Sequence, residues 1–176
     1  MTERDAEIDI DIRIEAEGWR APEIRAEQLT REAAGAVLKH ALPGSGGIEL
    51  SVLLTDDSGI AALNAAWRGR SGPTNVLSFP GDSPDAADQV PDVPVLLGDI
   101  AIALETVTRE ADATGIELSD HLRHLVVHGV LHLLGYDHED ETDADRMERC
   151  EIEILAALGV PDPYAAADRR LEHACP

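Results

Sequence analysis

The chain has few basic and few aromatic side chains. Its 176 residues include 14 lysines and arginines, with Lys39 the single lysine, against 35 aspartates and glutamates, so the formal net charge is −21. Phe, Trp and Tyr together make up 3% of the residues. Nucleic-acid-binding domains commonly carry a basic face, and one common kind of RNA-binding sheet stacks bases on aromatic side chains. The overall composition therefore argues against both kinds of surface.

Targeting and membrane signals are absent as well. No run approaches the 18 apolar residues of a membrane span, and the start at Met1 lacks the basic segment and apolar stretch of a signal peptide. Cys150 and Cys175 fit no spacing typical of a disulfide or a metal site. We therefore expect a cytoplasmic protein with no membrane partner, in which Cys150 is a core residue.

The apolar pattern predicts one α+β domain over residues 1–160. Strict alternation predicts strands at 8–14 and 48–54, and shorter apolar runs predict strands at 75–79 and 95–102. Helical spacing predicts five helices: 22–42, a short one carrying Ile60, Leu63 and Trp67, 104–113, 119–134 with Ser119 as its N-cap, and 142–158. This order favours a small, roughly four-stranded mixed sheet packed against helices. The composition predicts a mobile loop at residues 80–92 and a weakly ordered tail at residues 161–176.

Five of the seven histidines lie between His121 and His138. The first four form one stripe about 80° wide on a helix that advances about 100° per residue. The rest of this helix is apolar almost all round, which is typical of a buried central helix. A histidine stripe on such a helix indicates a cavity or a site.

His128 and His132 are spaced i and i+4, which places two imidazoles where one metal ion can bind both. Gly135 permits a sharp turn that can return His138 to the same point as a third ligand. Three nitrogen ligands without a fourth protein ligand are typical of catalytic zinc, because water can take the open position. Gly129 follows the first ligand where zinc peptidases carry a glutamate, which excludes that peptidase motif. Tight packing, or close approach of another backbone or of substrate, would explain a glycine in mid-helix.

The segment from His128 to His138, HGVLHLLGYDH, resembles the signature of the YbeY-type bacterial endoribonucleases, the rRNA maturation factors. Two further blocks resemble this family in the same order, one from Leu63 to Pro80 and one from Leu97 to Ile100. Together the three blocks span a core of about 50–145. Trp67 departs mildly from the family, which often has tyrosine there.

The resemblance implies a zinc-dependent endoribonuclease selective for single strands, which acts in 3′-end maturation of small-subunit rRNA and in ribosome quality control. It implies that His128, His132 and His138 are the zinc ligands and that Arg68 is the functional arginine of the site, contacting phosphate. The implied partners are ribosomal RNA and the ribosome or its proteins, and no DNA is expected. Because imidazole suits several divalent metals, a metal other than zinc stays open.

Weaker candidates surround the motif. Asp137, Asp99 and Glu139 are possible general bases, or carboxylates that orient a ligand, and His124 and His121 are interpreted as supporting or packing residues. Two other functions stay open: a ribosome-assembly binding factor whose zinc is structural, and a metal-dependent hydrolase of another substrate. A missing fourth ligand argues against the first, because structural zinc sites are normally closed.

The acidic residues are unevenly distributed. Residues Gly59–Gly81, which include Arg68 and Arg70, contain no aspartate or glutamate, and neither do His121–Tyr136. If these two segments face each other, they form a neutral-to-positive cleft within a negative surface, which bound zinc would charge further. The charge then predicts weak non-specific RNA binding and substrate delivery by a partner rather than an inability to bind RNA.

Overall fold

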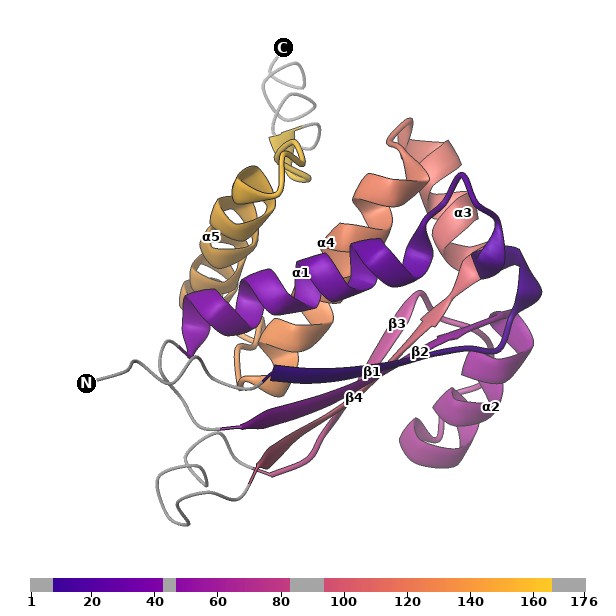
Figure 1. The fold of residues 1–176 in the computed structure, drawn as a ribbon, viewed down its shortest axis with the longest axis horizontal. Coiled ribbons are helices and arrows are strands. Elements are labelled where there is room, and N and C mark those ends of the chain that lie inside the picture. Colours follow the sequence, from indigo (N-terminus) through magenta and orange to yellow (C-terminus); the bar gives the residue numbers. More distant parts are fainter. Residues whose placement is uncertain (1–7, 43–46, 83–93, 166–176) are drawn as a thin grey trace.

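The computed structural model describes residues 8–42, 47–82 and 94–165. Figure 1 shows one layer of sheet with helices on both of its faces. In chain order the elements are β1 (Ile8–Ile14), the 3₁₀ helix η1 (Glu17–Arg20), α1 (Ala26–Ala41), β2 (Ile48–Thr55), α2 (Asp57–Arg68), β3 (Val76–Pro80), β4 (Val95–Ala103), α3 (Leu104–Thr114), α4 (Leu118–Leu133) and α5 (Glu141–Ala157).

The strands form one mixed sheet in the order β1-β2-β4-β3. Strands β1 and β4 both run parallel to β2, while β3 pairs antiparallel with β4. The edges of the sheet are therefore β1 and β3. This arrangement confirms the predicted α+β class, with its four-stranded mixed sheet and five helices.

Helices α1 and α4 pack against the sheet on one side, and α2 packs against β3 and β4 on the other (Figure 1). The larger core cluster lies between the sheet and α1, α4 and α5, and includes Leu50, Val52, Ile100, Val126 and Val130. A smaller cluster of Ile60, Leu77, Ala101 and Ala103 lies beneath α2. Helix α4 contacts three helices and two strands, so its position is fixed from several directions.

Three details differ from the sequence pattern. Helix α4 begins at Leu118 with Glu117 as its N-cap, so the prediction that Ser119 is the N-cap is wrong. The unpredicted η1 carries Trp19, whose indole Nε1 donates a hydrogen bond to the Thr55 carbonyl at 2.9 Å. Trp67 lies on α2 with Ile60 as expected, but Ile60 is fully buried whereas Trp67 is 73% exposed.

Two predicted segments fall largely outside the described residues. Of the predicted loop 80–92, residues 83–92 lie outside them, as do residues 166–176 of the predicted tail. Residues 161–165, the start of that tail, are described and carry Tyr164 against the side of α5. No helix in the described ranges is both long enough and apolar enough to cross a membrane.

Candidate metal centre

Helix α4 lies close to the sheet because Gly129 has no side chain. A Cβ at this position would lie 3.1 Å from Ile100 Cδ1 on β4 and 3.3 Å from Ser78 Oγ on β3. Ser78 Oγ instead donates a hydrogen bond to the Gly129 carbonyl at 3.2 Å. Close packing against the sheet therefore explains the mid-helix glycine, and it fixes the helical turn that carries His128.

A Schellman turn ends α4 and returns the chain toward the two helical histidines. The Gly135 N–H donates to the His132 carbonyl and the Tyr136 N–H donates to the Leu131 carbonyl, each at 3.0 Å. Gly135 has φ +89°, a left-handed conformation that glycine adopts without steric cost. The turn brings His138 beside His128 and His132, as the sequence predicts.

The three histidines offer ring nitrogens that all lie within 4.8 Å of one another. His128 Nε2 and His132 Nε2 are 3.0 Å apart, and the His138 ring centroid is 5.8 Å and 5.1 Å from those of His128 and His132. His138 is exposed and the other two are partly buried. The cluster therefore combines a helical pair of imidazoles with a third imidazole that is reachable from solvent.

The hydrogen bonds on the far side of each ring determine which nitrogens carry lone pairs. His132 Nδ1 is 3.0 Å from the Tyr136 carbonyl, and His128 Nδ1 is 2.6 Å from Glu151 Oε1. A carbonyl and a carboxylate only accept, so both Nδ1 atoms donate. In neutral rings both Nε2 atoms then present lone pairs to each other, an arrangement that requires a cation or proton between them.

These donors fit a zinc ion. Two nitrogens bound tetrahedrally at about 2.0–2.1 Å from zinc would be about 3.3–3.4 Å apart, close to the observed Nε2 separation. Burial, and then the proximity of His128 and His138, lower the pKa of His132, which favours the neutral, metal-binding imidazole. Within the described ranges no fourth His, Cys, Asp or Glu joins the cluster, so the donor set is that of an open site.

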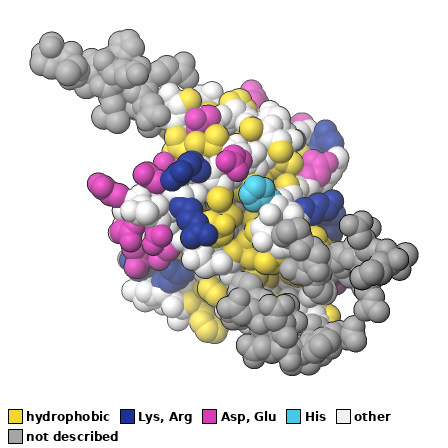
Figure 2. Space-filling view, turned by 90° about the vertical axis from the view of Figure 1, so that its left-hand side faces the viewer, with side chains coloured by type: hydrophobic (Ala, Val, Ile, Leu, Met, Phe, Trp, Pro, Cys, Tyr) yellow, Lys and Arg dark blue, Asp and Glu magenta, His cyan; other side chains and the backbone are white. Residues whose placement is uncertain are grey.

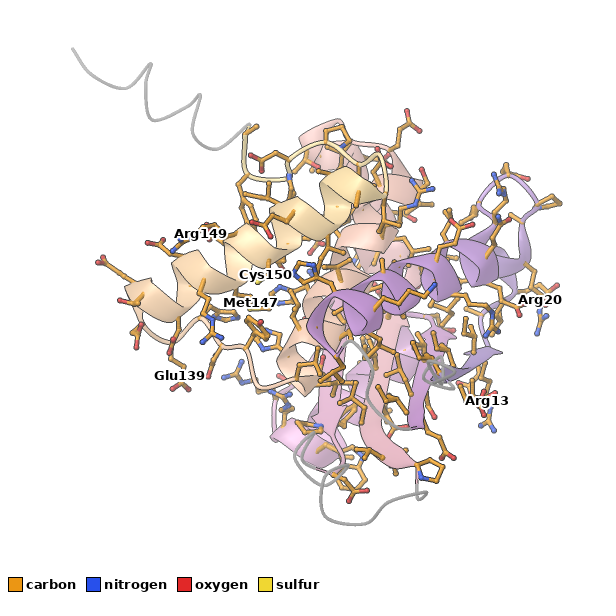
Figure 3. The ribbon with its side chains drawn as sticks, turned by 60° about the vertical axis from the view of Figure 1, so that its left-hand side comes forward. Arg13, Arg20, Glu139, Met147, Arg149 and Cys150 are labelled. Carbon is orange, nitrogen blue, oxygen red and sulfur yellow. The ribbon has the colours of Figure 1, made fainter. Side chains whose placement is uncertain are left out.

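Glu151 on α5 is a site residue that sequence reasoning missed. It is fully buried, and besides accepting from His128 it accepts a hydrogen bond from the Tyr164 hydroxyl. In Figure 3, Met147 and Cys150 lie on the side of α5 that faces α4, and Arg149 lies on the outer side. Glu151 follows Met147 by four residues and so lies on the apolar face of the helix. An unpaired carboxylate is costly there, and this position was the sequence signal that Glu151 has a buried partner.

The surroundings of Glu151 favour its charged form. Burial acts to raise its pKa, but His124, His128 and Tyr164 together outweigh burial and hold the pKa at about 2. His128 makes the direct bond, because His124 Nε2 is 3.7 Å from Oε1, beyond hydrogen-bond distance. Burial and the adjacent carboxylate raise the pKa of the Tyr164 hydroxyl, which therefore stays a donor.

Arg68 is at the C-terminal end of α2, next to the β3 edge of the sheet. Its Nη2 donates to the Ser78 carbonyl at 2.9 Å, and the hydroxyl of the same serine is bonded to Gly129. The guanidinium is thus connected through one residue to the helical turn that carries His128. No carboxylate in the described parts of the chain forms an ion pair with Arg68, so its charge is available to an anion.

The structure does not gather all of the weaker candidates. His124 is beside Glu151, whereas His121 is bonded to Glu110 at 2.7 Å, away from the cluster. Asp137 is exposed and accepts a hydrogen bond from the His138 backbone N–H at 2.7 Å, so it supports the turn that carries His138.

Neither of the remaining two carboxylates joins the histidine cluster. Asp99 lines a cavity on the α2 side of the sheet, while its neighbour Ile100 faces α4, so the sheet separates Asp99 from the histidines. Glu139 is exposed and extends outward before α5 in Figure 3.

The two acid-free segments meet as their distribution suggested. Strand β3 belongs to the first segment, and α4 from His121 onward belongs to the second; they contact through Ser78 and Gly129. The exposed acids concentrate elsewhere, as on α5 with Glu141, Asp143, Asp145, Glu148 and Glu153. Figure 2 shows acidic side chains gathered along one side of the face in view. The contact between β3 and α4 therefore joins two segments that contain no acidic residues.

Comparison with known proteins identifies the family. Residues 11–159 match the family model described as Endoribonuclease YbeY. The chain is 53% identical over 162 residues to a curated protein of that name from Rhodopseudomonas palustris strain HaA2, covering 90% of this chain and 83% of the relative. The corresponding protein of Nitrobacter hamburgensis is 48% identical over 159 residues, covering 90% and 83%.

A protein of Thermotoga maritima with a known solution structure superimposes with a TM-score of 0.53 at 26% identity, covering 85% of this chain and 91% of that one. The family match spans the end of β1, all of β2, β3 and β4, the histidine cluster, Arg68 and Glu151. The chain belongs to the YbeY endoribonuclease family.

Proposed function

We propose that this protein is a cytoplasmic, zinc-dependent endoribonuclease that cuts single-stranded RNA in the 3′-end maturation of small-subunit rRNA and in ribosome quality control. The supporting observation is the convergence of His128 and His132 Nε2 at 3.0 Å, with both Nδ1 atoms committed to acceptors. His138 completes a three-nitrogen set that lacks a fourth protein ligand among the described residues. The family name supports RNA as the substrate.

His128, His132 and His138 would hold the zinc. Bound zinc supplies a water-derived nucleophile at neutral pH and a positive charge near the phosphate, so no strong protein base is needed. The protein's own contribution is orientation: Tyr136 and Glu151 fix the two helical imidazoles, and the Schellman turn positions His138. Asp137 and Asp99 are not needed as bases in this scheme.

Arg68 would bind the scissile phosphate. Its guanidinium can donate two parallel hydrogen bonds to phosphate oxygens, and Ser78 already holds one nitrogen at the β3 edge. A group fixed before substrate arrives loses less side-chain entropy on binding. We therefore assign phosphate binding, and with it stabilisation of the developing charge, to this arginine.

The charge distribution supports delivery of RNA by the ribosome or its proteins. A net charge of −21 gives little electrostatic attraction to free RNA. The contact of β3 with α4 joins two segments without acidic residues, so it repels a phosphate backbone less than an acidic surface such as that of α5. Duplex RNA alone should therefore bind weakly at physiological salt, and tight binding would contradict this part of the proposal.

A binding factor with structural zinc is the alternative. It would require a closed ligand set, and the histidine cluster offers an open one within the described ranges. A peptidase is disfavoured because Gly129 occupies the position of the catalytic glutamate and is packed against Ile100.

The test is cleavage of a labelled single-stranded RNA and of its duplex by zinc-loaded protein. His132→Ala and Arg68→Ala should each lower the rate by at least 100-fold, and the duplex should be cut far more slowly than the single strand. Arg31→Ala is the matched control, because Arg31 donates to the Ile10 carbonyl at 2.8 Å on β1, the other edge strand. It removes an arginine and an edge-strand hydrogen bond without touching the site.

The outcomes separate the alternatives. Loss of activity in Arg31→Ala equal to that in Arg68→Ala would mean that Arg68 acts through fold stability alone. Full activity in both His132→Ala and Arg68→Ala would assign the cleavage to a contaminant and refute the nuclease proposal. Zinc binding without cleavage of any single-stranded RNA would favour the binding factor.

A further inference from the structure

We propose, building on the metal centre above, that Glu151 is a positioning residue that holds the Nδ1–H of His128 so that its Nε2 faces the ion, and that Tyr164 holds Glu151 in place. The histidine motif contains neither residue. Both lie beyond the three matching blocks, on α5 and in the turn that follows it.

The bond between His128 and Glu151 has the geometry that this role requires. Its length of 2.6 Å is short for a nitrogen–oxygen hydrogen bond, as expected of a charge-assisted one. The carboxylate side chain is 1% exposed, so water does not compete for the acceptor. An imidazole whose Nδ1–H is held by a carboxylate cannot bind metal through that nitrogen, which leaves Nε2 as the ligand atom.

Tyr164 fixes the other oxygen of the carboxylate. Its hydroxyl donates to Glu151 Oε2, while His128 is bonded to Oε1. The Tyr164 ring also meets His124 edge-on, with centroids 5.7 Å apart. Both oxygens of Glu151 therefore have donors, and a free rotation of the carboxylate would break both bonds. Tyr164, in the turn after α5, thus acts on the metal centre through the Glu151 carboxylate.

Two competing interpretations make different predictions. If Glu151 only stabilises the fold, its removal lowers stability and leaves zinc affinity unchanged. If Glu151 is itself a ligand, then His124, His128 and Glu151, whose ligand atoms also lie within 4.8 Å of one another, hold a second ion. The pairing at 2.6 Å favours the positioning role, because an ion between His128 Nδ1 and the carboxylate would need that bond to open.

The experiment measures the zinc dissociation constant by competition with a chromophoric chelator, and the zinc content per chain, in the full-length protein. Glu151→Ala should weaken zinc binding by about 10–100-fold, as is usual when the partner of a metal-bound histidine is removed. Glu151→Gln keeps an acceptor oxygen without the charge and should lose less. Tyr164→Phe removes only the hydroxyl and should lose less than tenfold.

The matched control is Glu110→Ala. Glu110 lies on α3 and pairs at 2.7 Å with His121, which is on α4 like His128. His121 itself is outside the histidine cluster. This variant should leave the zinc dissociation constant within twofold of the unmodified value. In the zinc-loaded protein, the NMR signal of the His128 Nδ1–H should be lost or shifted in Glu151→Ala and retained in Glu110→Ala.

Each result is decisive. A zinc dissociation constant within twofold of the unmodified value in the Glu151 variants would overturn the positioning role while leaving the metal centre intact. Two zinc ions per unmodified chain would overturn it in favour of a second site. If the unmodified protein binds no zinc, the proposed function fails first. If Glu151→Ala does not fold, Glu151→Gln and Tyr164→Phe decide, because a loss of zinc affinity in either supports the role.

Discussion

Replacing Gly129 with alanine tests whether α4 is held against the sheet as closely as the structure indicates. The new Cβ would lie 3.1 Å and 3.2 Å from two side-chain carbons of Ile100, a residue 1% exposed on the inner strand β4, and 3.3 Å from Ser78 Oγ. Such overpacking costs about 1–3 kcal/mol. Alanine is better than glycine in a helix by about 1 kcal/mol, so the net loss is about 0–2 kcal/mol.

Gly35→Ala provides the matched control. Gly35 lies within α1, and a Cβ there would meet no atom within 4 Å, so only the helical gain of about 1 kcal/mol applies. The two variants should therefore differ by about 1–3 kcal/mol in unfolding free energy. For a domain of this size that corresponds to a difference in Tm of about 2–12 °C.

The assay is thermal and urea unfolding of both variants without zinc, so that metal binding does not mask the difference. The structure predicts that Gly35→Ala raises Tm while Gly129→Ala lowers it or leaves it unchanged. Equal stabilisation by the two substitutions would refute the tight contact of α4 with β3 and β4. It would also remove the packing explanation for the glycine in the histidine motif.

Two further predictions concern Arg68 and Asp57. Arg68→Lys keeps the charge but loses the paired donors of the guanidinium, so the cleavage rate should fall at least tenfold. The unfolding free energy should change by less than about 1 kcal/mol. An unchanged cleavage rate would show that charge alone suffices. Asp57 accepts hydrogen bonds from the Thr106 N–H and hydroxyl and pairs with Arg109 at 2.8 Å. Burial acts to raise the pKa of Asp57, but these partners lower it below its ordinary value of 3.8. The charged carboxylate therefore stabilises the fold above that pH, and this contribution is lost as the pH falls through the lowered pKa. Asp57→Asn should therefore reduce stability at pH 6 more than at pH 3 in urea unfolding, and an equal loss at both would contradict the assignment.

Local patterns in the sequence predicted most of the elements. Alternating isoleucines predicted β1, and the helical histidine stripe predicted α4 and the meeting of His128 with His132, because spacing along one element determines which side chains share a face. His138 was also predictable, since Gly135 marks the turn that returns it.

Contacts between distant segments were not predictable from the same patterns. Glu151 meets His128 across 23 residues, and Tyr164 meets His124 across 40, so neither pairing has a local signature. Asp99 was a possible general base from its place in a block that resembles the family, but strand alternation places it on the α2 side of the sheet. Trp67 followed the helical apolar spacing, yet its indole is exposed and meets the sheet only at the edge of the Phe79 ring on β3.

Zinc K-edge X-ray absorption of the purified, zinc-loaded protein tests the proposed metal centre most directly. We predict one zinc per chain, bound by three imidazole nitrogens and one oxygen at about 2.0–2.1 Å, with one imidazole lost in His132→Ala. A fourth imidazole, a sulfur ligand, or an unchanged spectrum in His132→Ala would contradict the open three-histidine centre on which the proposed function rests.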